Sequence, residues 1–309
     1  MAEITSELIK RLRESSGAGM MDCKKALAEN KGDFDASVDW LRKKGLASAA
    51  KKAGRIASEG LVGIAIKDNK GAVIELNSET DFVAKNSIFQ DLATAISGYA
   101  LEVGGDFEKL KQHVCPKAKK KVEEVVAEHV GTIGENIQLR RSAGISVNEG
   151  VVASYIHNQI APNLGKIAVL IGLESKGNKD KLVALGKQIA MHIAAAKPQS
   201  LDVASLDQNL IKREKDVLSE QARASGKPEE IIGKMIEGRI RKFYEEVVLL
   251  EQLFVIDGKT KINKILQDAA KDVGAEVKIS NFVCFTLGEG IDKKEEDFAA
   301  EVAKAAAGR

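Results

Sequence analysis

The chain has 309 residues, and its 47 Lys and Arg nearly cancel its 45 Asp and Glu, which leaves a net charge of +2. This balance gives no reason to expect a nucleic-acid or anionic-membrane partner. Hydrophobic residues make up 44% and charged residues 30%, as in ordinary globular proteins. A chain of this length is expected to form two or more modules with buried cores.

The three cysteines, Cys23, Cys115 and Cys284, are widely spaced and form no CxxC pair. They therefore predict neither a disulfide framework nor a zinc site, and they fit a reducing compartment. No segment approaches the ~20 apolar residues of a membrane span, and the first residues lack a basic region followed by an apolar stretch. We expect a cytoplasmic protein with no membrane partner.

Residues 1–45 predict three short helices. Apolar residues recur at helical spacing in three segments, which turns at 16–19 and 30–33 separate. In the second segment, Met21, Ala26 and Leu27 are expected to face inward. The size and the turn placement are similar to those of a ubiquitin-associated (UBA) bundle. Residues 46–60, rich in Ala, Lys and Gly, predict a partly helical linker.

Residues 61–67 and 72–77 predict a β-hairpin whose turn contains Gly71. Downstream, Ser87 and Gln90 have the spacing of a capping box, so a helix is expected to begin at Ser87. The residues of that helix expected to face the core are Ile88, Leu92, Ala95 and Ile96.

Between hairpin and helix, the segment TDFVAKN at 80–86 places Phe82 and Val83 where a connection is usually polar. Loops lie on the surface and often carry binding residues. Phe82 is therefore either tucked under its own helix or offered to a partner. Because a single exposed phenylalanine is unremarkable, the residues alone slightly favour the tucked position.

A second unit follows the same order of elements. After helical sequence at about 117–130, strands are expected at 150–156 and 166–173 and a helix at about 179–196. Two units of one order predict an α+β fold with a duplicated core and antiparallel sheets. A later helix at about 261–273 and a strand at about 276–287 are expected to rejoin this core.

Residues 205–248 predict a protruding antiparallel helical hairpin. Ser205 and Gln208 have capping-box spacing, and the segment 225–228 supplies a glycine and a proline for the turn. A repeat of seven predicts a coiled-coil seam between the helices. The residues of the repeat are Leu210, Val217 and Ala224, with Ile211 and Leu218 beside them.

No set of residues typical of an enzyme or of a nucleotide site is present. The chain lacks GxxxxGK[ST], and Gly17 and Gly19 are followed by Asp22 where a dinucleotide loop requires a third glycine. No GxSxG or Cys/His constellation occurs. His192 lies on an apolar helix and is expected to be packed and hydrogen-bonded. We expect no cofactor, no metal and no catalytic residues. The four histidines, which share no ligand spacing, are His113, His129, His157 and His192.

Two long segments carry a family resemblance. TDFVAKN at 80–86 and GAGMMDCKKAL at 17–27 closely resemble the signature segments of bacterial elongation factor Ts, the nucleotide-exchange factor for elongation factor Tu. Two such strings in the expected order are far more specific than a short motif. Further matching stretches are GENI at 134–137, MHIAAAKP at 191–198, GEGI at 288–291 and DFAAEVA at 297–303.

The resemblance implies an exchange factor that binds elongation factor Tu with GDP, displaces its Mg²⁺ and promotes GDP release so that GTP can bind. In that family the segment that matches Thr80, Asp81, Phe82 and Val83 intrudes beside the partner's Mg²⁺ site. By similarity, Phe82 enters an apolar slot of the G domain. Asp81 either repels phosphate, competes for Mg²⁺ or orients the loop through a backbone hydrogen bond, and the last interpretation is the simplest.

The resemblance also implies partner contacts on the first bundle and on a core strand. His157 matches a histidine near the partner's phosphate-binding loop, although the segment 158–163 is longer than the glycine-rich turn expected there. For Met20 and Met21 the alternative is an ordinary place in the bundle core, which we expect for one of them. The bundle residues that match the contact surface are Gly17, Gly19, Met20, Met21 and Lys24.

The family's organisation suggests dimer contacts through the hairpin and a C-terminal module that packs on the partner. The expected modules are a UBA-like three-helix bundle at 1–45, a linker at 46–60, a core N-subdomain at 61–141, a core C-subdomain at 142–204 and 249–287, a coiled-coil hairpin at 205–248 and a C-terminal helical module at 288–309.

A different class of function is a non-catalytic module that binds RNA or a peptide through the UBA-like bundle and the basic runs near 43–55 and 117–121. Aromatic residues make up only 4% of the chain, which leaves few stacking platforms. Runs of charge are more often solvated helix faces. We expect no direct nucleic-acid partner.

Overall fold

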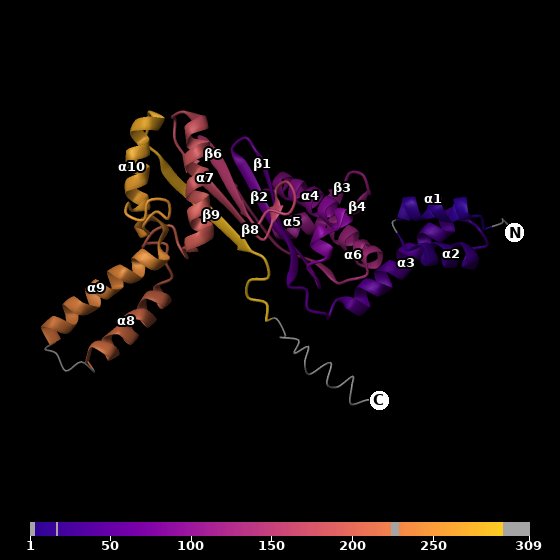
Figure 1. The fold of residues 1–309 in the computed structure, drawn as a ribbon, viewed down its shortest axis with the longest axis horizontal. Helices are drawn as coiled ribbons and strands as arrows, with labels where there is room; N and C mark the ends of the chain where they lie inside the picture. Colours follow the sequence, from indigo (N-terminus) through magenta and orange to yellow (C-terminus); the bar gives the residue numbers. More distant parts are fainter. Residues whose placement is uncertain (1–3, 17, 224–228, 293–309) are drawn as a thin grey trace.

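The computed structural model describes residues 4–16, 18–223 and 229–292. The expectations for Gly17, for the turn at 225–228 and for residues 293–309 of the C-terminal module lie outside these residues. Within them the fold is α+β with antiparallel sheets, as predicted (Figure 1).

Two antiparallel sheets form the centre of the molecule. They pack face to face through apolar residues that include Val62, Val73, Val152 and Leu170. The first sheet has the order β5-β2-β1-β7 and the second the order β6-β8-β9. The bounds are β1 Glu59–Lys67, β2 Lys70–Ser78, β5 Ile137–Ser146, β7 Leu164–Gly165, β6 Gly150–His157, β8 Ile167–Glu174 and β9 Lys278–Thr286.

Helices cover the outer face of each sheet, which gives the order helix, sheet, sheet, helix (Figure 1). Both faces of β1 are buried, so its alternate residues enter two cores. Leu61 packs in the core under α4, and Val62 packs in the core between the two sheets. The helices on the first sheet are α4 Ser87–Glu102, α5 Phe107–Gln112 and α6 Val122–Ile133, and those on the second are α7 Lys179–Ala196 and α10 Ile262–Val273.

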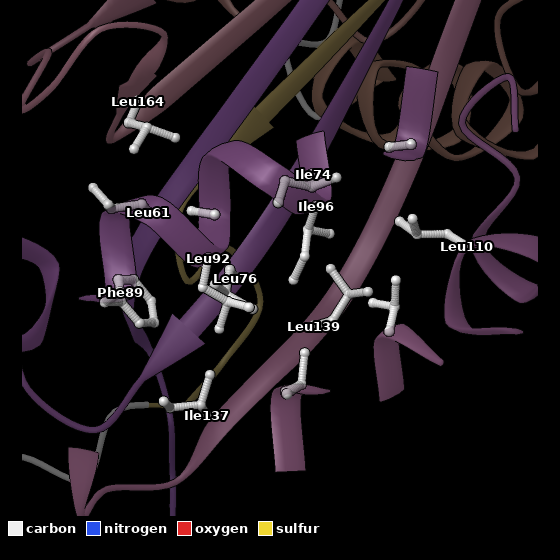
Figure 2. Packing of buried hydrophobic residues seen from close by; sticks show 14 of the residues in the cluster. Leu61, Ile74, Leu76, Phe89, Leu92, Ile96, Leu110, Ile137, Leu139 and Leu164 are labelled. Carbon is white, nitrogen blue, oxygen red and sulfur yellow. The ribbon is translucent and has the colours of Figure 1, made fainter. Parts of the chain in front are cut away.

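Figure 2 shows the core beneath the first group of helices, where side chains from β1 and β2 meet those of α4. Phe89 is fully buried here, whereas Ile88 is exposed and Ala95 is only half-buried. The predicted inward face of α4 was therefore right for Leu92 and Ile96 and wrong for Ile88, because Phe89 takes the inward position in the first turn. A short two-stranded ribbon, β3 Val114–Cys115 with β4 Lys120–Lys121, lies between α5 and α6 in the sequence.

The turn of the first hairpin consists of Asp68 and Asn69, because Lys67 pairs with Lys70. Asp68 adopts a φ of 56°, a left-handed conformation that Asp tolerates. Gly71, expected in the turn, lies in β2 instead. A Cβ at Gly71 would come within 2.8 Å of Val152 Cγ1, so the close approach of the two sheets requires glycine there.

Strand β5 was not predicted, because Arg140 and Arg141 interrupt its apolar pattern. A register shift opposite Glu75 allows both arginines to reach that fully buried carboxylate. Arg140 Nη1 lies 3.0 Å from Glu75 Oε1, and Arg141 Nε lies 2.5 Å from Glu75 Oε2. The backbone N–H of Gly288 donates to the same carboxylate at 2.8 Å. The strand also crosses the expected module boundary between residues 141 and 142.

The N-terminal residues form three helices, α1 Ser6–Ser16, α2 Met20–Glu29 and α3 Phe34–Lys52, around a small core of their own. Helix α3 continues to Lys52 and packs on α6. The two helices approach closely at glycines, since a Cβ on Gly131 would lie 2.6 Å from the Cα of Gly45. Arg42 Nε is 3.0 Å from Glu128 Oε1 beside this crossing.

Helices α8 Gln208–Arg223 and α9 Glu229–Val247 lie side by side and project from the second sheet's end of the molecule (Figure 1). The predicted seam is displaced, because Val217 is 48% exposed while Ile211 and Leu218 are buried. The capping box at Ser205 was also wrong: Asp207 Oδ1 accepts from the backbone N–H of Asn209 at 2.9 Å, and Gln208 Nε2 donates to the carbonyl of Leu206.

Candidate functional site

The segment that follows β2 leaves the first sheet and turns into α4. A short 3-10 helix, Val83–Lys85, occupies its second half. Val83 and Ala84 are buried in the core under α4, whereas Asp81 and Phe82 are exposed. The segment is therefore attached to the core immediately after the two residues that it presents to solvent.

Phe82 is 76% exposed, so the tucked position that the residues alone slightly favoured is wrong. Val83, one residue later, fills the place in the core. The backbone of Phe82 is helical, with φ −62° and ψ −37°, and is therefore unstrained. Lys85 lies beside this side chain: its Nζ is 5.9 Å from the centroid of the Phe82 ring and 3.8 Å from Asp81 Oδ2.

Helix α4 begins at Ser87 as predicted, but its N-cap is Asn86. The side chain of Asn86 accepts from the backbone N–H of Ile88 at 2.9 Å. Gln90 Nε2 donates to the carbonyl of Ala84 at 3.0 Å instead of completing a capping box with Ser87. Both contacts fix the chain on the downstream side of Phe82.

Thr80 fixes the upstream side through a carboxylate that the sequence analysis did not single out. Its backbone N–H donates to Glu135 Oε2 at 2.9 Å, and its Oγ1 donates to Glu135 Oε1 at 2.7 Å. Ser78 Oγ donates to the carbonyl of Thr80 at 2.9 Å. Thr80 thus has its backbone N–H, its carbonyl and its hydroxyl all hydrogen-bonded within the chain.

The residues beside this contact are also bonded to one another. Glu79 Oε1 accepts from the backbone N–H of Asn136 at 2.5 Å, and Arg55 Nη1 lies 3.4 Å from the same oxygen. Asn136 Nδ2 donates to the carbonyl of Arg55 at 2.8 Å. The signal available in the sequence was GENI at 134–137, in which Gly134 ends α6 with a left-handed φ of 90° and directs Glu135 and Asn136 back to the loop.

On the N-terminal bundle, Gly19 is the N-cap of α2, and Met20, Met21 and Lys24 are exposed. The expectation that one methionine belongs to the bundle core was wrong: Met20 is 50% and Met21 75% exposed. The face of α2 that packs in the bundle core consists instead of Cys23, Ala26 and Leu27. Gly17, the remaining residue of this predicted set, lies outside the described residues.

His157 ends β6 and is exposed. Its Nδ1 lies 3.2 Å from the hydroxyl of Tyr155. The segment 158–163 leads from here to β7, which pairs with β1 in the first sheet. The predicted site residues therefore occupy three separate places: the loop after β2, helix α2 of the bundle and the end of β6 (Figure 1).

His192 is buried, as expected from its apolar helix. Its Nε2 is 2.9 Å from Gln252 Oε1, and its Nδ1 accepts from the backbone N–H of Val255 at 3.2 Å. Burial lowers the pKa of His192, against a smaller opposing effect of the hydrogen bond to Gln252.

In the described part of the chain, no group of three or more His, Cys, Asp or Glu side chains is placed to hold a metal ion. No helix among the described residues is both long and apolar enough to cross a membrane.

Comparison with known proteins settles the family. A family model described as "Elongation factor TS" matches residues 79–289. The chain is 58% identical over 306 residues to an elongation factor Ts of Rhodospirillum centenum, an alignment that covers 99% of this chain and 100% of that protein. The chain belongs to the elongation factor Ts family.

Other members of the elongation factor Ts family are similarly close along their whole length. The protein of Paramagnetospirillum magneticum is 57% identical over 309 residues, with 100% of this chain and 99% of that protein covered. That of Rhodospirillum rubrum is 58% identical over 304 residues, with 98% of each covered. The family model begins at Glu79, so it includes the Phe82 loop and the Glu135 contact within one matched region.

Proposed function

We propose that this chain is a guanine-nucleotide exchange factor that binds elongation factor Tu with GDP and accelerates the release of GDP. Membership of the elongation factor Ts family supports this function. The observation that carries the mechanism is the exposed Phe82 side chain on a loop held at both ends. Such a factor lowers the barrier to an exchange of ligands and performs no covalent step of its own.

Exchange follows from linkage between two binding equilibria. If the factor binds the empty G protein more tightly than the GDP form, GDP binding weakens by the same factor. A nanomolar nucleotide affinity corresponds to about 12 kcal/mol, and each ~1.4 kcal/mol of differential contact changes it tenfold. Because Mg²⁺ bridges the phosphates to the G protein, its displacement is an efficient way to weaken the nucleotide.

In this mechanism Phe82 enters an apolar slot of the G domain beside the Mg²⁺ site. Filling such a slot with a phenylalanine side chain contributes about 1.5 to 3 kcal/mol, enough for a change of roughly tenfold to a hundredfold in nucleotide affinity. Thr80 and Val83 hold the loop, and Asp81 helps to orient it, with Lys85 Nζ 3.8 Å from its Oδ2. Met20, Met21 and Lys24 on α2 add a second contact, and His157 a third.

The finer features of the architecture belong to the same proposal. The N-terminal three-helix bundle is UBA-like, and α8 with α9 forms a coiled-coil hairpin that makes dimer contacts. The chain works in the cytoplasm, with the bundle at 1–45 and the hairpin at 205–248 as separate modules. RNA binding is the less favoured function, because basic residues of the predicted patches pair with acids: Arg55 with Glu79, and Lys120 Nζ with Glu128 Oε1 at 2.6 Å.

The experiment that tests this function is the release of labelled GDP from elongation factor Tu, with the wild-type chain and with Phe82→Ala. We expect the wild-type chain to accelerate release and Phe82→Ala to lose at least tenfold of that acceleration, since a central aromatic anchor costs about 2 kcal/mol or more on truncation. Lys176→Ala, which changes an exposed residue outside the three predicted sites, is the control. Equal rates for wild type and Phe82→Ala would refute the role of Phe82.

A further inference from the structure

Glu135 continues the pairing of two strands beyond the point where their backbones separate. The last pair of the β2–β5 ladder is Ser78 with Ile137. In the same register, Glu79 would face Asn136 and Thr80 would face Glu135. At both of these positions a side-chain carboxylate accepts the backbone hydrogen bond: Glu79 Oε1 from Asn136 N, and Glu135 Oε2 from Thr80 N.

This arrangement explains how the loop leaves the sheet without losing its hydrogen bonds. A strand that diverges from its neighbour leaves N–H groups without partners, and an unpaired N–H that is shielded from water is costly. The carboxylate of Glu135 reaches further than a backbone carbonyl and also accepts from Thr80 Oγ1 at 2.7 Å. Hydrogen bonds to charged groups are about twice as strong as neutral ones.

We propose that Glu135 is a positioning residue for nucleotide exchange: by binding Thr80 it fixes the direction in which Phe82 projects. Two residues separate Thr80 from Val83, which is buried in the core. With both of these residues held, Phe82 has little freedom before it meets a partner, so less entropy is lost on binding. This inference rests on the proposed function, and Glu135 acts through Phe82 without having to contact the partner.

The first test is Glu135→Gln in the GDP-release assay, alone and combined with Phe82→Ala. Gln has the same shape but carries no charge, so the contacts to Thr80 become neutral and weaker hydrogen bonds. We expect stimulated release to slow about tenfold. In the Phe82→Ala background the same replacement should change the rate less than twofold. Glu108→Gln, which alters an exposed carboxylate of α5, should behave as wild type.

A second test needs no partner. In the free chain, the backbone amide of Thr80 should exchange its hydrogen about tenfold faster in Glu135→Gln than in wild type, because that N–H loses its charged acceptor. The amide of Val73, in the middle of β2, should be unchanged, which shows that the sheet is intact.

Two results would overturn the positioning role. One is a Thr80 amide that exchanges at the wild-type rate in Glu135→Gln. The other is an equal fold-loss of exchange activity in the presence and absence of Phe82, because Glu135 would then act independently of that side chain. Failure of the wild-type chain to accelerate GDP release would instead refute the proposed function, and the amide measurement would still report on the Thr80 contact itself.

Discussion

Phe82 is exposed because nearby residues of the loop already fill the core and make the loop's hydrogen bonds. Val83 fills the apolar position beneath α4, and Thr80 is hydrogen-bonded to Glu135. The Phe82 side chain therefore contributes little to the fold, and its 76% exposure leaves its apolar surface for a partner. In the proposed mechanism, Val83 thus serves stability and the adjacent Phe82 serves exchange.

This separation predicts different effects for two neighbouring truncations. Val83→Ala removes buried methyl groups and should lower the free energy of unfolding by about 2 kcal/mol. Phe82→Ala should change it by less than about 0.5 kcal/mol, as for most surface substitutions. Urea denaturation of the two variants measures both values. A larger loss for Phe82→Ala than for Val83→Ala would mean that the phenylalanine packs against the core in solution.

Helices α3 and α6 connect the N-terminal bundle to the first sheet. Their crossing is close because glycines meet there, and Lys52 Nζ donates to the carbonyl of Gly134 at 2.6 Å at the end of the same helix pair. Gly134 immediately precedes the residue that holds Thr80. The bundle and the Phe82 loop, two of the three predicted contact regions, are thus attached to neighbouring residues at the end of α6.

We predict that Gly131→Ala disrupts this crossing, since its Cβ would lie 2.6 Å from the Cα of Gly45. Overpacking of this kind costs about 1 to 3 kcal/mol. Gly98→Ala is the matched control, because a Cβ at that position in α4 meets nothing within 4 Å and alanine favours a helix by about 1 kcal/mol. Thermal unfolding should show a lower Tm for the first variant and an equal or higher Tm for the second. A Gly131→Ala variant as stable as wild type would contradict the tight crossing.

Elements with a clear apolar period could be predicted from the sequence, and α7 was found at its expected bounds, Lys179–Ala196. Strand β5 could not be predicted, because its apolar pattern is interrupted by two arginines. Their partner, the buried Glu75 of β2, is known only from the structure. The place of the Phe82 loop followed from the strand before it and the helix after it. Its orientation did not, since either Phe82 or Val83 could have filled the core. Glu135 was missed because it is 55 residues from Thr80 in the chain.

Glu75, in the middle of β2, joins the first sheet to the segment that follows β9 of the second. The carboxylate belongs to β2, yet it accepts from Gly288 after β9, and Arg141 Nη2 donates to the carbonyl of Thr286 at 3.0 Å. Burial acts to raise the pKa of Glu75, but hydrogen bonds from Gly288, Arg141 and Asn77 outweigh it and hold the pKa below its usual value. Glu75 is therefore charged in the folded protein at neutral pH.

This lowered pKa predicts the pH dependence of stability. The contribution of Glu75 should be complete above pH 4.5, its usual pKa, and should be lost as the pH falls through the lower value of the folded state. Glu75→Gln should lower the free energy of unfolding at neutral pH by about 3 kcal/mol, because Arg140 and Arg141 both lose a buried charged partner. It should also flatten the loss of stability below pH 4.5. Glu149→Gln, an exposed carboxylate, is the control for denaturation measured between pH 3 and 7. An unchanged slope in Glu75→Gln would contradict the assignment.

In the proposed mechanism, this chain releases GDP by displacing Mg²⁺ from its partner with the Phe82 loop. The most direct measurement is the rate of GDP release from elongation factor Tu, with and without the chain, at millimolar and at very low free Mg²⁺. We predict strong acceleration at millimolar Mg²⁺ and much weaker acceleration when the ion is already absent. Equal acceleration at both concentrations would contradict displacement of the ion, and no acceleration at either would contradict the exchange function.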